Sequence, residues 1–312
     1  MTRFALAVLL LLVGTSAADA WNDLGHMTVA RLAWQELTAD ERGRVVGFLK
    51  SHPHAEEFLK AKRPDNIPED EWVFLRAATW ADWVRSNHAK DYHVGERHYI
   101  NYPVKMPGSS VAAPEPDELA ENIVSGIGKQ LKAATAGGDQ GARAVALTWL
   151  FHLVGDIHQP LHAVALFGDT FPTGDRGGNL STVRIAGGGV VKLHQFWDGL
   201  LGSTVSRAEI LAAALKATKL ADGDAAVAKD LAAHTTPVAW AKEAAAVAKA
   251  VAYRDGELKP ANTADRPADA DIPTAPDDYA PKAGEAARRG VYKAGKRLAE
   301  VLRQVIKANK ND

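Results

Sequence analysis

The chain has 312 residues, a formal net charge of −1, eleven His and no Cys. This balance provides no broad basic surface and argues against tight binding of duplex nucleic acid, but not against phosphate chemistry, because bound metal ions can supply positive charge. The absence of Cys excludes disulfides and thiolate ligands, which leaves His nitrogens and carboxylate oxygens, a donor set that suits zinc or similar ions.

Residues 1–20 have the order of a secretory signal peptide. Arg3 precedes the apolar run Phe4–Val13, and the small-residue cleavage pattern Ala18-Asp19-Ala20 follows. A buried first helix explains this order less well, and the run is too short to span a membrane. We therefore predict export to the periplasm or the medium, and a single monomeric domain over residues 21–312 without a membrane anchor.

Helical periodicity dominates the rest of the chain. Thr38-Ala39-Asp40-Glu41 is a capping box that opens a helix. Only Leu180–Leu193, where β-branched residues flank three glycines, predicts a β-hairpin, and the Pro-rich, Asp-rich segment Glu257–Pro281 predicts a long surface loop. The predicted helices cover Gly25–Leu37, Thr38–Lys50, Asp70–Ser86, Pro116–Ala134, Gly141–Ile157, Ser206–Thr218, Pro237–Arg254 and Ala283–Lys307. The predicted fold is all-α, a single multi-helix domain with one small β-hairpin.

Two pairs of His and Asp lie four residues apart. His152 and Asp156 share one face of a predicted helix, so both can reach one metal ion. His194 and Asp198 repeat this spacing. A single pair is better explained by a hydrogen bond on the helix surface, but two pairs in one chain favour metal binding.

Further candidates lie on either side of the first pair. Asp82 lies in an aromatic, apolar helical segment, where an unpaired charge is costly, so it requires a partner. If the helix continued, His162 would lie off the face that carries the first pair. Pro160 should break the helix, however, and can direct His162 toward a neighbouring ion. His98 and His26, each taken alone, are better explained as structural histidines.

These segments together resemble the family of zinc-dependent single-strand nucleases and 3′-nucleotidases. The motifs Trp-Asn-Asp-Leu-Gly-His, Trp-Ala-Asp, His-Tyr-Ile-Asn, His-x-x-x-Asp-Ile-His-Gln-Pro-Leu-His, Gly-Gly-Asn and Leu-His-x-x-Trp-Asp follow one another between Trp21 and Asp198. The resemblance implies a cleft with three Zn²⁺. It assigns Asp82, His98, His152 and Asp156 to one ion, His162, His194 and Asp198 to a second, and His26, Asp82 and the α-amine and carbonyl of Trp21 to the third. A terminal amine, with a pKa of about 7.7, can serve as such a ligand once deprotonated.

The resemblance also implies a reaction. Single-stranded DNA, RNA and 3′-nucleotides would be hydrolysed to 5′-phosphates by a metal-bound hydroxide, with Asp82 orienting or deprotonating it and Asp156 as a second catalytic carboxylate. Arg85 becomes a candidate for a phosphate contact, and a solvated helix charge explains it equally well. Asn179 matches a family position near the scissile phosphate, with a simple turn residue as the alternative.

Two residues are candidates for contacting the base. Tyr99 can stack on an unpaired base, with core packing as the alternative. Asn101 stands where some relatives carry Asp, and an amide donates as well as accepts, so their base preference does not carry over.

Two rival functions remain. Zinc-dependent phospholipase C is similar in its terminal Trp and its ligand order, but its last pair typically ends in Glu, whereas this chain has Asp198. A zinc-binding protein without turnover would have closed metal sites, because only catalytic sites keep an open position.

Overall fold

The computed structural model describes residues 21–309, and the signal peptide predicted over residues 1–20 lies outside them. The α-helices are α1 (Asp23–Glu36), α2 (Ala39–Lys50), α3 (Glu69–Ala77), α4 (Trp80–Asn87), α5 (Ala89–Tyr92), α6 (Ile123–Thr135), α7 (Gln140–Asp156), α8 (Leu193–Asp198), α9 (Arg207–Ala221), α10 (Ala225–Ala233), α11 (Pro237–Val247) and α12 (Tyr279–Ala308). Short 3-10 or π segments are η1 (Ala55–Leu59), η2 (Gly95–His98), η3 (Pro160–Ala163), η4 (Ala248–Ala252), η5 (Arg254–Gly256), η6 (Thr263–Asp265) and η7 (Asp269–Asp271). The predicted multi-helix fold is confirmed.

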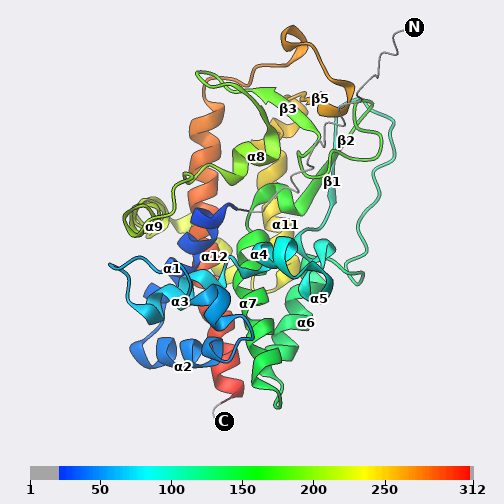
Figure 1. Cartoon of the computed structure of the whole chain (residues 1–312). Helices are drawn as coiled ribbons and strands as arrows, with labels where there is room; N and C mark the ends of the chain where they lie inside the picture. Colours follow the sequence, from blue (N-terminus) through cyan, green and yellow to red (C-terminus); the bar gives the residue numbers. More distant parts are fainter. Residues whose placement is uncertain (1–20, 310–312) are drawn as a thin grey trace, which may run out of the picture.

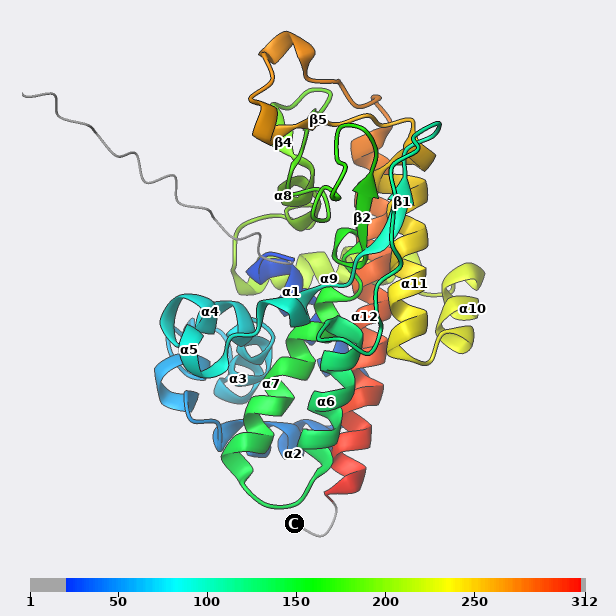
Figure 2. The same cartoon turned by 90° about the vertical axis from the view of Figure 1, so that its right-hand side faces the viewer.

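The helices pack around α7, which is buried along most of its length. Helix α12 runs the length of the molecule and packs against α1, α9, α7 and α6, while α6 lies beside α7 (Figure 2). Figure 1 shows the strands gathered at one end of this bundle and α2 at the other. The C-terminal end of α7 points toward the strands, so the residues that follow it enter the β-rich end of the molecule.

The β structure is larger than predicted. The hairpin is confirmed as β3 (Ser181–Arg184) antiparallel to β4 (Val190–Lys192), and β5 (Ala261–Asn262) joins its other edge. A separate parallel pair, β1 (Tyr102–Lys105) with β2 (Val164–Phe167), was not predicted. Strand β2 is buried on both faces, so it lacks the alternation of apolar and polar residues that marks a strand.

Helix boundaries depend on local capping. The capping box at Thr38 is present: its side chain accepts from the backbone N–H of Glu41, whose carboxylate accepts from the N–H of Thr38. The prediction that a helix begins at Pro116 is wrong, because Asn122 caps α6 by accepting from the backbone N–H groups of Val124 and Ser125.

Two other helix predictions need correction, and some helices were missed. The helix expected over Asp70–Ser86 is two helices, α3 and α4, separated by the non-helical Thr79. The helix expected over Pro237–Arg254 leaves α-geometry after α11 and continues as the π-helical η4. Helices α5 and α10 were not predicted. Glu257–Pro281 is mostly loop, as expected, but contains β5, η6, η7 and the start of α12.

The described residues contain no helix with the length and apolar character needed to cross a bilayer.

Candidate metal centre

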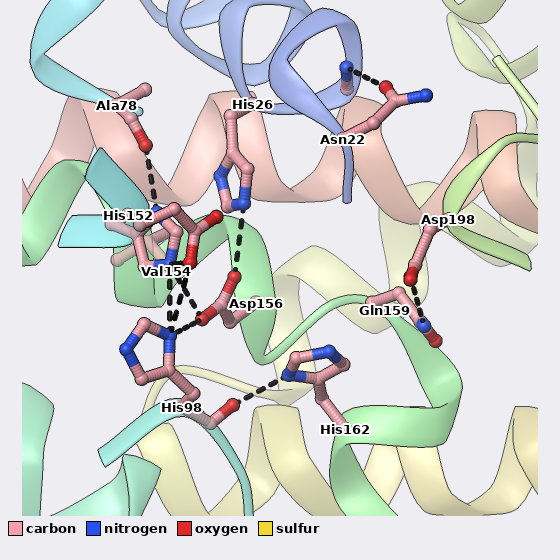
Figure 3. Close-up of polar contacts among 12 residues, drawn as sticks. Asn22, His26, Ala78, His98, His152, Val154, Asp156, Gln159, His162 and Asp198 are labelled. Carbon is pink, nitrogen blue, oxygen red and sulfur yellow. Dashed lines mark hydrogen bonds and ion pairs between the residues drawn. The ribbon is translucent and has the colours of Figure 1, made fainter. Parts of the chain in front are cut away.

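Five of the predicted ligands converge at the centre of the molecule from α1, α4, η2 and α7. We call them the His26 group: His26, Asp82, His98, His152 and Asp156. Asp156 lies between three histidines (Figure 3): its Oδ1 is 3.2 Å from His26 Nε2, and its Oδ2 is 3.0 Å from both His98 Nδ1 and His152 Nε2. One carboxylate thus joins elements that are far apart in the sequence.

Asp82 faces the same histidines from α4. Its Oδ1 is 3.6 Å from His152 Nε2 and 4.0 Å from His98 Nδ1, and it accepts a hydrogen bond of 2.8 Å from Arg85 Nη2. The group therefore offers two overlapping sets of three possible ligands, one of His26, Asp82 and His152 and one of His98, His152 and Asp156. Sharing of His152 between the sets means that two ions bound there would be close neighbours.

The remaining three side chains form a second cluster, the His194 group: His162, His194 and Asp198. His162 Nε2 is 3.1 Å from His194 Nε2, which is 3.6 Å from Asp198 Oδ2. Helix α7 ends at Asp156, and η3 begins at Pro160, so the predicted break is confirmed and turns His162 away from the His26 group.

Backbone carbonyls orient the imidazoles of both groups. His152 Nδ1 donates to the carbonyl of Ala78 (2.9 Å), His162 Nδ1 to that of His98 (2.6 Å, Figure 3), and His194 Nδ1 to that of Gly177 (2.5 Å). A carbonyl only accepts, so each Nδ1 must carry a hydrogen and each neutral ring presents the lone pair of Nε2. Such contacts are typical of metal-ligating histidines.

The arrangement fits a divalent cation. The Nε2 lone pairs of His162 and His194 face each other at 3.1 Å, which is unfavourable unless a cation or proton lies between them. Within the described residues, Nδ1 of the fully buried His26 has no hydrogen-bond partner, and its Nε2 and Asp156 Oδ1, although 3.2 Å apart, do not form a hydrogen bond of good geometry. Buried polar atoms are normally paired, so these atoms point to a bound ligand. Imidazole and carboxylate donors suit zinc.

The charges around the two groups shift the pKa values of three of these side chains. Burial opposes ionisation of Asp156, but the attraction of His152 and hydrogen bonds from the histidines outweigh it and hold its pKa well below the usual value. Burial likewise opposes protonation of His152, but Asp156 and Asp82 raise its pKa to about 9. A cation binds the neutral ring, so metal binding at His152 is linked to release of its proton. Burial lowers the pKa of His162, which favours its neutral form.

Trp21 is buried at the start of α1, next to this centre. The backbone N–H of Asn22 donates to the carbonyl of Asp198 (3.5 Å), and the side chain of Asn22 accepts from the N–H of Gly25 and so caps α1 (Figure 3). Coordination by the backbone of Trp21 stays a prediction.

The predicted substrate contacts lie in different places, and the cavity lined by Tyr99 and Asn101 contains none of the eight candidate metal ligands. Arg85 pairs with Asp82, so it is not simply a solvated helix charge. Tyr99 is 42% exposed, which excludes core packing, and lines a cavity of about 320 Å³ together with Asn101. The side chain of Asn179 donates to the carbonyl of Arg176 (2.9 Å), as expected for a turn residue.

Gln159 is a functional candidate that sequence reasoning missed, although it lies within the longest motif. Its Nε2 donates to Asp198 Oδ1 (2.8 Å, Figure 3), and its Oε1 accepts from the N–H of Leu161 (2.6 Å). We expect Gln159→Leu to weaken metal binding at the His194 group about 10- to 100-fold, as loss of a hydrogen bond to a ligand typically does. Competition for Zn²⁺ with a chromophoric chelator measures this, and an affinity equal to that of the wild type would contradict it.

Gly155 allows His26 to approach α7. A Cβ at this position would lie 2.8 Å from His26 Nδ1, and the ring cannot easily retreat because it stacks on His152 with a centroid distance of 4.1 Å. We expect Gly155→Ala to displace the His26 ring and lower metal content at the His26 group while α7 stays intact. Metal analysis with circular dichroism checks this, and Gly128→Ala, where a Cβ meets no atom within 4 Å, is the control.

Two other groups of His and carboxylates are explained by their own contacts. His54 Nδ1 accepts the indole N–H of Trp80 (3.1 Å), so its neutral ring carries hydrogen on Nε2 and offers no lone pair toward Glu57. Glu243 forms ion pairs with Lys293 and Arg297, which supply the positive charge that a metal would provide.

His158 lies close to the ligands in sequence but faces away from them. Its Nδ1 donates to the carbonyl of Val154, and its Nε2 accepts from Arg297 Nη1 (2.7 Å). Burial and then the charge of Arg297 lower its pKa to about 3. The ring is therefore a neutral structural link to α12.

Comparison with known proteins adds two findings. A family model described as S1/P1 Nuclease matches residues 21–307. Endonuclease 4 of Arabidopsis thaliana is 26% identical over 197 residues, which cover 62% of this chain and 59% of that protein. The aligned region therefore spans somewhat more than half the length of this relative.

Proposed function

Because the chain belongs to the S1/P1 nuclease family, we propose that it is an exported zinc-dependent endonuclease that hydrolyses single-stranded DNA, RNA and 3′-nucleotides to 5′-phosphates. The observation that carries the proposal is the convergence of eight buried or nearly buried His and Asp side chains in two adjacent groups. Three bound Zn²⁺ would supply Lewis-acid stabilisation of the phosphoryl oxygens and activation of water.

The two carboxylates of the His26 group have different surroundings. Asp156 is fully buried among three histidines, so it holds their positions and balances their charge. The Asp82 side chain keeps 12% of its surface exposed and is hydrogen-bonded to Arg85. Asp82 is therefore the carboxylate that an incoming water can reach, and we assign it the orientation of that water, with Arg85 beside it as the contact for a phosphate oxygen.

Residues next to His98 favour an unpaired strand. Tyr99 presents an exposed ring, and stacking on such a ring tolerates any base but requires that the base leave a duplex. Asn101 lines the same cavity and can both donate to and accept from a base edge. These two side chains support single-stranded nucleic acid as the substrate, with Asn179 as a further phosphate contact near the His194 group.

The proposal is tested with processed protein that begins at Trp21. Metal analysis should find three zinc ions per chain, and single-stranded DNA should be cleaved faster than duplex DNA. Phosphatidylcholine hydrolysis is the control for the phospholipase alternative. A folded, zinc-loaded protein that is inert on DNA, RNA and 3′-nucleotides would instead indicate a zinc-binding protein without turnover.

Export and metal binding are coupled in this proposal. We expect that one extra residue before Trp21 lowers the zinc content from three ions to two without unfolding the chain, because the α-amine becomes a peptide nitrogen that cannot coordinate. Protein that retains Ala20 is compared with protein that begins at Trp21 by metal analysis and thermal unfolding. Equal zinc content and activity in the two forms would show that the terminal amine is not a ligand.

A further inference from the structure

Asp175 is a buried carboxylate that belongs to neither ligand group. It is fully inaccessible to solvent and accepts three hydrogen bonds, from the N–H of Leu166 (2.8 Å), the hydroxyl of Ser181 (2.6 Å) and the hydroxyl of Tyr253 (2.7 Å). These donors come from β2, from β3 and from the residue after η4. Burying a carboxylate is costly, and hydrogen bonds from three elements compensate for that cost.

The turn that follows Asp175 has a strained backbone. Arg176, Gly177 and Gly178 have φ values of +56°, +60° and +81° in succession, a conformation that is unfavourable for a residue with a side chain such as Arg176. A Cβ on Gly177 would lie 2.3 Å from the carbonyl oxygen of Leu161, so only glycine fits there. The N–H of Leu180 donates to the carbonyl of Asp175 (3.0 Å) and closes the turn.

This turn carries the groups that orient His194. The carbonyl of Gly177 accepts from His194 Nδ1 (2.5 Å), and the carbonyl of Gly178 accepts from the backbone N–H of His194 (3.2 Å). On its other side the turn packs against Leu161, the neighbour of His162. A displacement of the turn would therefore change the position of the His194 ring relative to His162.

We propose that Asp175 is a positioning residue for the His194 group. By anchoring the turn to β2, β3 and Tyr253, it holds the Gly177 carbonyl where it fixes the ring orientation of His194. The inference rests on the proposed metal binding at the His194 group. It assigns Asp175 no contact with the metal or the substrate, so its effect must act through His194.

The test measures metal binding at the His194 group separately from folding. Zn²⁺ affinity is obtained by competition with a chromophoric chelator, and the d–d absorption of Co²⁺-substituted protein reports ligand geometry. We expect Asp175→Ala to weaken Zn²⁺ binding at the His194 group about 10- to 100-fold and to alter the Co²⁺ spectrum. Asp175→Asn, which retains one oxygen acceptor, should restore part of the affinity. The affinity of the His26 group should stay unchanged.

Two controls separate positioning from stability. Asp222→Asn changes another carboxylate that accepts from a tyrosine hydroxyl, that of Tyr292 (2.8 Å), and Asp222 belongs to neither ligand group. It should leave both affinities unchanged. Tyr253→Phe removes one hydrogen bond to Asp175 and leaves the Asp175 side chain in place. It therefore tests the positioning role of Asp175 even if Asp175→Ala does not fold. It should weaken the same site by a smaller factor.

Different results would overturn different statements. Folded Asp175→Asn and Tyr253→Phe proteins with wild-type zinc affinity and Co²⁺ spectrum at the His194 group would overturn the positioning role, even if their melting temperatures fall. His194→Ala is the reference for a lost site and should bind one zinc fewer than the wild type. If His194→Ala and the wild type bind the same number of zinc ions, the metal assignment of the proposed function is wrong.

Discussion

Replacing Asp156 with Ala is expected to empty the His26 group of metal and to lower kcat/KM on single-stranded DNA by at least about 10³-fold. The two oxygens of Asp156 lie 3.0 to 3.2 Å from the nitrogens of His26, His98 and His152. Without this carboxylate, three buried imidazoles face each other. The group also loses one of the two negative charges that attract the cation. Metal stabilisation of a phosphoryl-transfer transition state is worth several kcal/mol, and each 1.36 kcal/mol corresponds to about tenfold in rate.

The measurement combines metal analysis with kinetics on the same preparation. Asp156→Asn is the informative second variant, because it preserves the shape of the side chain but replaces one acceptor oxygen with a donor. Its activity should fall nearly as far as that of the Ala variant. Asp277→Ala, which removes an exposed carboxylate from the Glu257–Pro281 loop, is the control. An Asp156→Ala protein that keeps its full zinc content and more than a tenth of its activity would exclude this role.

The sequence predicts the parts of the site that local geometry determines. His152 with Asp156, and His194 with Asp198, are i, i+4 pairs, and a helix places such residues on one face whatever surrounds it. Pro160 likewise ends a helix through its own covalent structure. For these residues, spacing alone predicted the ligand pairs and the change of direction between the two groups.

Other ligands could not be predicted from spacing. His26 and His98 meet Asp156 only because α1 and η2 pack against α7, and neither has a partner nearby in sequence. Their assignment came from the family resemblance. The carbonyls of Ala78 and Gly177 have no sequence signal at all, since every residue carries a carbonyl and only the fold shows which one faces a histidine.

In the fold, too, features set by neighbouring residues could be predicted, whereas features set by tertiary packing could not. The capping box at Thr38 involves two residues three positions apart and was predicted correctly. The parallel pairing of β1 with β2 joins Tyr102 to Val164 across 61 intervening residues, and each strand has only four residues. Pairing of this kind depends on how α6 and α7 fold back between the strands, so tertiary packing decides it rather than local propensity.

Removing the metal is expected to abolish hydrolysis and to destabilise the whole domain. Zinc at about a thousandfold excess over its dissociation constant contributes roughly 4 kcal/mol to the free energy of unfolding per site. In a domain of this size, 1 kcal/mol changes the melting temperature by about 2 to 4 °C, so chelation should lower it by roughly 10 °C per site. Calorimetry before and after dialysis against a chelator, followed by readdition of Zn²⁺, measures the shift and its reversal.

The two ligand groups can be told apart by repeating the chelation on variants. The His26 group joins α1, α4, η2 and α7, whereas the His194 group joins η3 to α8, so loss of the first should loosen more of the helical core. Asp156→Ala should therefore show a much smaller response to chelator than the wild type, and Asp198→Ala should keep most of it. A melting temperature that does not respond to chelator in the wild type would mean that the buried histidines are stable without a cation. Their facing lone pairs, such as those of His162 and His194, would then have to be bridged by protons.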